Sequence, residues 1–78
     1  MNLDEITLCS RLAALLAWAP GMSPGALMDL SMGDHHISAV HLAKETPLTY
    51  EQARMYLAGL QQDIEVVRAN NYKVEGLL

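Results

Sequence analysis

Residues 48–53 have the sequence LTYEQA, and they contain the clearest helix start in this 78-residue chain. Thr49 is a favoured N-cap residue, and Gln52 stands three positions later, where its side chain can hydrogen-bond back to the cap. Leu48 and Ala53 have the spacing of a hydrophobic staple across the same start. The stretch therefore predicts a helix over residues 50–62, with one apolar face and one polar face.

A shorter helix is expected just before this start. Ser38 is a candidate N-cap, and the apolar residues that follow it have helical spacing. The chain reaches Pro47 a few residues later, and a proline discourages the preceding residue from being helical. This helix should therefore end near Glu45 or Thr46, so that residues 38–62 form a helix-turn-helix.

The sequence pattern changes after residue 63. Residues 64–68 are rich in β-branched side chains, and residues 72–75 alternate between polar and apolar. Between them lie Asn70 and Asn71, and asparagine tolerates the backbone conformation of a tight turn. These features predict a β-hairpin over residues 64–76.

The N-terminal part of the chain predicts two further helices. The first covers residues 3–18, and Pro20-Gly21 ends it; the second starts at Ser23-Pro24 and ends at Gly33. The first helix is apolar on more than one face, so we expect it to pack on its own domain and on a second copy of the chain. The predicted dimer interface consists of Leu8, Leu12, Leu15, Leu16 and Trp18.

Together these elements predict a mainly α fold with a small C-terminal β-hairpin, which is a winged helix-turn-helix with an extra N-terminal helix. We expect one domain over residues 1–78, because no linker or repeat interrupts it. Residues 1–32 would supply the N-terminal helices and the dimer contact, residues 38–62 the helix-turn-helix, and residues 64–76 the wing.

Two segments resemble known DNA-binding families. Residues 37–49, ISAVHLAKETPLT, have the caps and the inward leucine in the register of the biotin-repressor N-terminal domain. Residues 49–57, TYEQARMYL, resemble the recognition helix of the pilus-operon regulators related to PapI. The resemblance covers residues 37–76 and implies a winged helix-turn-helix domain. It departs from the family at Asp63, where a glycine often precedes the wing.

The resemblance implies a small DNA-binding transcriptional regulator that acts as a homodimer on a two-fold site in double-stranded DNA. Residues 50–62 would lie in the major groove, and the wing would contact the DNA backbone or the minor groove. The implied DNA-binding residues are Lys44, Thr49, Tyr50, Gln52, Arg54, Met55, Arg68, Asn70, Asn71 and Lys73.

The charge of the chain favours an alternative. The formal net charge is −4, which argues against nucleic-acid binding through bulk positive potential. In addition, 51% of the residues are apolar, which is more than so small a core readily hides. The alternative function is therefore a non-enzymatic protein-binding adaptor or inhibitor on a winged-helix fold.

The residues do not indicate an enzyme, a metal site or a membrane span. The chain has neither a nucleophile with a plausible base nor a glycine-rich phosphate loop, so we expect no enzyme and no cofactor. The three histidines and Cys9 lack the spacing of a zinc site, so we expect no metal. The single cysteine fits a reducing cytoplasm. The longest apolar run, residues 12–19, is far shorter than the roughly 20 residues that span a membrane.

Overall fold

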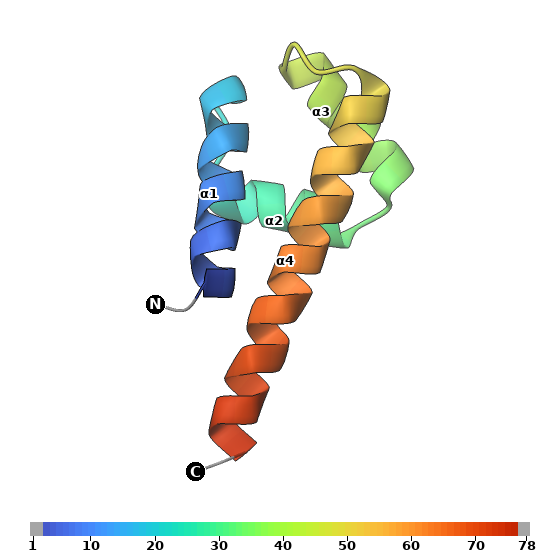
Figure 1. The fold of residues 1–78 in the computed structure, drawn as a ribbon. Coiled ribbons are helices and arrows are strands. Elements are labelled where there is room, and N and C mark those ends of the chain that lie inside the picture. Colours follow the sequence, from blue (N-terminus) through green and yellow to red (C-terminus); the bar gives the residue numbers. More distant parts are fainter. Residues whose placement is uncertain (1–2, 77–78) are drawn as a thin grey trace.

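The computed structural model describes residues 3–76, and it describes the side chains of residues 4–71. The described chain forms four helices: α1 (Leu3–Trp18), α2 (Pro24–Met32), α3 (His35–Glu45) and α4 (Tyr50–Gly76) (Figure 1). Helix α4 packs against each of the other three. It contains 27 residues and is about 40 Å long, so that its C-terminal end extends beyond α1 (Figure 1).

The N-caps predicted for α2 and α3 can be compared with those in the structure. The bounds of α1 and α2 are those expected, and the Ser23 hydroxyl caps α2 by accepting from the Ala26 N–H at 3.1 Å. The predicted N-cap of α3, Ser38, is wrong. Asp34 caps this helix by accepting from the backbone N–H groups of His36 and Ile37 at 2.9 and 3.3 Å. Helix α3 is therefore about one turn longer at its start, and Ser38 is buried inside it.

The start of α4 confirms the predicted capping box. The Thr49 N–H donates to the Gln52 side-chain oxygen at 3.0 Å, and the Gln52 N–H donates to the Thr49 hydroxyl at 3.1 Å. Each side chain thus satisfies a backbone donor that the first turn of a helix leaves without a partner. The turn that joins α3 to α4 is held in the same way, because the Thr46 hydroxyl donates to the Leu42 carbonyl and accepts from the Leu48 N–H.

The predicted C-terminal β-hairpin is wrong, and with it the winged helix-turn-helix class. Residues 64–76 continue α4, and no strand occurs anywhere between residues 3 and 76. The buried residues Leu57, Leu60 and Ile64 follow one another at intervals of three and four, which is the period of a helix. This stripe continues the apolar face of α4 past residue 63, so burial on α1 overrides the β preference of the branched side chains.

Two polar contacts fasten the second half of α4 to α1. The Arg11 side chain donates from Nε to Oδ2 of Asp63 at 2.5 Å, and Asn70 donates from its amide to the Asp4 carboxylate. Gly59 makes the first contact sterically possible, since a methyl group at this position would overlap the Arg11 guanidinium. The absence of a side chain at Gly59 therefore lets Arg11 lie across α4 and reach Asp63, one turn further on.

The core is a single cluster to which every helix contributes. Leu15 comes from α1, Leu27 from α2, Leu42 from α3, and Leu57 and Leu60 from α4; each of these five side chains is fully buried. Ala39, Leu48, Ala53 and Ile64 complete the cluster. Because the alanines face the leucines, the helices approach closely and the core consists mainly of leucine side chains.

Candidate functional site

The structure separates the predicted DNA-binding residues into two groups. Thr49 is the N-cap of α4, and Tyr50, Gln52, Arg54 and Met55 lie in its first two turns. The exposed Lys44 lies in the last turn of α3. Without a wing, Arg68, Asn70 and Asn71 lie on the other half of α4. Arg68 follows Arg54 by 14 positions, or about 21 Å along the helix. The backbone of Lys73 belongs to α4, but its side chain lies outside the described side chains.

Several of these side chains already have roles within the chain. Thr49 and Gln52 form the capping box, and Asn70 binds Asp4. The Tyr50 hydroxyl is 2.5 Å from Nδ1 of His36, and their rings meet edge to face with centroids 5.5 Å apart. On the other side, the Arg54 guanidinium carbon is 5.8 Å from the Tyr50 ring centre, within the range of a cation–π contact.

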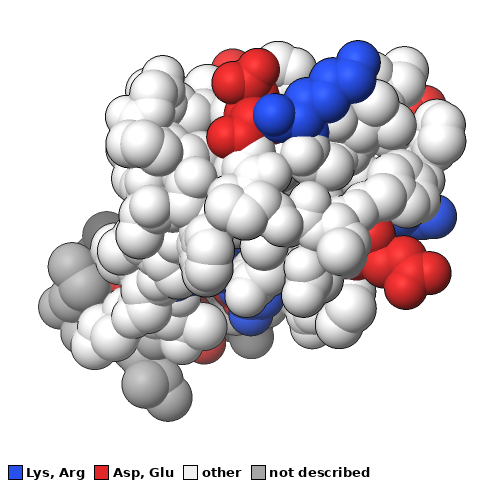
Figure 2. Space-filling model, turned by 90° about the horizontal axis from the view of Figure 1, so that it is seen from above, with Lys and Arg blue, Asp and Glu red and all other residues white. Residues whose placement is uncertain are grey.

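The charged residues do not form a continuous basic surface in the face that contains the α3–α4 turn. Figure 2 shows Lys and Arg side chains lying beside Asp and Glu side chains, mostly toward the edges of the view, with uncharged surface between them. In the sequence, Glu45 follows Lys44, and Glu51 precedes Arg54 by three positions. Neighbouring carboxylates weaken the attraction that these bases exert on phosphate.

The outer face of α1 is a surface without charged side chains. Ile6 and Trp18 are 47% and 49% exposed, and small residues fill the helix surface between them. The one charged residue in this stretch, Arg11, bends toward α4 to bind Asp63. We define the α1 outer face as the exposed residues of this stretch, none of which is charged: Ile6, Thr7, Cys9, Ser10, Ala13, Ala14, Ala17 and Trp18.

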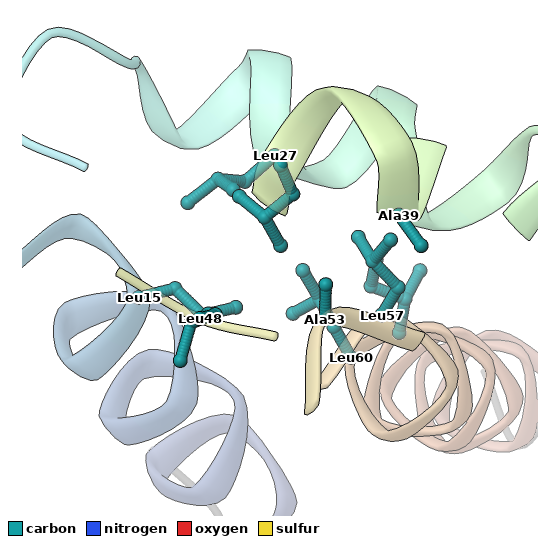
Figure 3. Packing of buried hydrophobic residues seen from close by; sticks show 9 residues of the cluster. Leu15, Leu27, Ala39, Leu48, Ala53, Leu57 and Leu60 are labelled. Carbon is teal, nitrogen blue, oxygen red and sulfur yellow. The ribbon is translucent and has the colours of Figure 1, made fainter. Parts of the chain in front are cut away.

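Most of the predicted dimer-interface residues lie on the opposite side of α1. Leu15 points into the core toward the other helices (Figure 3), and it is fully buried there. Leu8, Leu12 and Leu16 are partly buried against the same core. Trp18 is the one residue of the predicted interface that belongs to the α1 outer face. The leucines therefore serve the chain's own packing, and smaller residues face outward.

A cleft lies on another part of the surface, between α2, α3 and the loop of residues 19–23. Its volume is about 890 Å³. Asp29 and Leu30 of α2 contribute to its lining, as do Ser38, His41 and Glu45 from one face of α3. Neither a lysine nor an arginine lines it.

Between residues 3 and 76, no three or more histidine, cysteine, aspartate or glutamate side chains are grouped so that they could hold a metal ion. Within the same range, each helix is too short or too polar to cross a membrane.

Sequence reasoning placed a dimer contact on the first helix but named only Trp18 of the α1 outer face, and it missed the cleft. A signal for the rest of this face was present, because residues 6, 10, 13 and 17 are uncharged and recur at helical spacing. The cleft has no such signal, because three segments form it only after they pack together. No protein-family model, curated protein or solved structure matches this chain.

Proposed function

We propose that this protein is a non-enzymatic protein-binding module and that the α1 outer face is its binding surface. The supporting observation is the complete lack of charge among the eight exposed residues of this face. Charged residues make up roughly a quarter to a third of an ordinary soluble surface, so about two would be expected here. A surface without charges is cheap to remove from water, and the cores of protein interfaces are depleted in charged residues.

We propose a second copy of the chain as the partner of this face. If two α1 helices pack antiparallel about a two-fold axis near residue 12, Trp18 of one copy lies opposite Ile6 of the other. Ser10 then lies opposite Ala14, and small residues at the centre allow the two helices to approach closely. The large side chains at both ends cover the edges of the contact, and tryptophan is a frequent hot-spot residue at interfaces.

The substitution Ala13→Glu tests this function. It places two carboxylates, one from each copy, near the two-fold axis of the proposed dimer, where they would lose water and repel each other. We expect the wild type to dimerise at micromolar concentration and the variant to dissociate at least about tenfold more readily, which corresponds to about 1.4 kcal/mol. Sedimentation velocity over a concentration series measures both dissociation constants.

The matched control is Ala58→Glu, which makes the same change at an exposed alanine of α4. It should leave the dissociation constant of the dimer unchanged, and circular dichroism should show that both variants keep their helices. A wild type that stays monomeric at high micromolar concentration would show that the proposed self-association is wrong, and so would equal effects of the two substitutions.

DNA binding is a second candidate, favoured by one observation. Helices α3 and α4 are joined by the short turn of residues 46–49, and the exposed Lys44, Arg54 and Met55 lie beside it. These three exposed side chains are the part of the predicted DNA surface that belongs to the two helices of this turn. With so few cations, binding would be weak and strongly dependent on salt.

Fluorescence anisotropy with duplex DNA over a salt series tests this second candidate. Binding through the first turns of α4 predicts an affinity that falls with salt and that drops several-fold with Arg54→Ala. The substitution Arg68→Ala, about 21 Å further along α4, should have a much smaller effect. If the protein does not bind DNA even at low salt, this candidate is rejected.

A further inference from the structure

The cleft between α2 and α3 has the size of a ligand site and is separate from the α1 outer face. Its volume of about 890 Å³ lies within the range of known small-molecule pockets. None of the eight residues of the α1 outer face lines it. The cleft therefore shares no lining residue with the proposed dimer contact.

The charged groups of the cleft are two carboxylates. Asp29 lines it from α2 and Glu45 from α3, and both side chains are exposed. Among the described residues, neither carboxylate forms an ion pair or a hydrogen bond with another side chain. Neither a lysine nor an arginine lines the cleft, so the only base beside these two carboxylates in the lining is His41.

The hydroxyl of Ser38 supplies an independent sign of a ligand. Ser38 is only 5% exposed, and its hydroxyl has no hydrogen-bond partner among the described residues. No side-chain polar atom in that part of the chain is both sealed from solvent and without a partner, so the Ser38 hydroxyl keeps some exposure, and Ser38 lines the cleft. By contrast, Ser31 is fully buried and donates to the Met28 carbonyl at 2.7 Å. A ligand donor would satisfy the Ser38 oxygen.

We propose that this cleft binds an aliphatic ammonium group. An ammonium carries a positive charge and three N–H donors but no acceptor, which complements two carboxylates and an unpartnered hydroxyl. The carbon stem of such a ligand would pack against Met22 and Leu30, which also line the cleft. A free diamine and a lysine side chain of a partner protein present this same chemistry.

An NMR titration of the isotope-labelled full chain tests the proposal with two probes. The diamine cadaverine represents the free amine, and the tripeptide Gly-Lys-Gly represents the lysine side chain. We expect at least one probe to cause saturable shifts of the backbone signals around Leu30, Ser38 and His41. The uncharged diol of the same length as cadaverine should cause none of them.

Charge-neutral variants show whether the cleft residues hold the ammonium. Asp29→Asn and Glu45→Gln should each weaken binding about two- to fivefold, as expected for an exposed ion pair. Ser38→Ala should weaken it by a comparable factor through the lost hydrogen bond. The control Glu65→Gln, an exposed glutamate of α4 outside the cleft, should change nothing.

The outcomes distinguish a free amine from a lysine side chain as the ligand. They also test ammonium binding independently of the proposed dimer. Binding of cadaverine alone assigns the cleft to a free amine, and binding of the peptide alone assigns it to a lysine side chain. Saturable shifts from neither probe, equal shifts from the diol, or unchanged binding in the Asp29→Asn/Glu45→Gln double variant would overturn the proposal. Ala13→Glu should leave ammonium binding intact, so the two proposals can fail independently.

Discussion

Replacing Leu57 with alanine is expected to lower the free energy of unfolding by about 2–5 kcal/mol. Leu57 is fully buried in the first half of α4, where it belongs to the same cluster as Leu27 of α2 (Figure 3) and Leu42 of α3. The truncation removes apolar contacts and leaves a cavity that three helices cannot easily close. Because a chain of this length has roughly 4–12 kcal/mol of stability in total, the loss is a large fraction of it. Urea denaturation followed by circular dichroism measures the loss.

Two further variants give this prediction its controls. Met55 is 74% exposed on the same helix, so Met55→Ala should change the free energy of unfolding by less than about 0.5 kcal/mol. Leu57→Met keeps the side-chain volume and should cost less than about 1.5 kcal/mol, which leaves a folded protein to measure if the alanine variant unfolds. Similar small losses for Leu57→Ala and Met55→Ala would show that the core is not where the structure places it.

Placing proline at position 65 is expected to cost roughly 3 kcal/mol and to remove helical signal. Glu65 is exposed in the interior of α4, so the change acts through the backbone: proline removes one helical hydrogen bond and clashes with the preceding turn. The break would also detach Asn70 from Asp4 at the start of α1. Circular dichroism and urea denaturation report the two effects.

The control for this substitution is Glu65→Ala, which removes the same side chain but favours a helix. It should leave the helical signal and the stability nearly unchanged. In a β-hairpin over residues 64–76, position 65 would lie on a two-stranded ribbon whose edges tolerate proline better. Equal behaviour of the proline and alanine variants would therefore contradict a continuous α4.

The parts of the fold that depend on contacts between residues close in the sequence were predictable. Ser23 and Thr49 cap their helices through bonds to residues three positions away, and the chemistry of such a cap is visible in the sequence. The start of α3 was harder, because Asp34 and Ser38 are both good caps one turn apart. The start at Asp34 adds about one turn of helix, and Ser38 is then a buried residue inside α3.

The hairpin was predicted wrongly because distant contacts decide the conformation of residues 64–76. A preference for β structure is worth at most about 1 kcal/mol and depends on the surroundings of each residue. Here Ile64 is part of the core. Asp63 pairs with Arg11, which is 52 positions away in the sequence. Asn70 binds Asp4, which is 66 positions away. None of these partners is visible in the local pattern.

The candidate sites were predictable only in part, for the same reason. The sequence shows that α1 is apolar on more than one face, but the way it packs on α4 decides which face is buried. Leu15 therefore faces inward, whereas Ala13 and Trp18 face outward. Asp29 and Glu45 are 16 positions apart, and they share a cleft only because α2 and α3 fold against each other.

Intermolecular nuclear Overhauser effects in a dimer of labelled and unlabelled chains test most directly whether two copies meet through the α1 outer face. The antiparallel contact predicts signals between the Trp18 ring of one copy and the Ile6 methyl groups of the other. These two side chains are separated by most of the length of α1 within one chain, so such signals must arise between copies. A dimer whose intermolecular signals come only from α3 or α4, or a sample with none because the chain is monomeric, would contradict the proposed function.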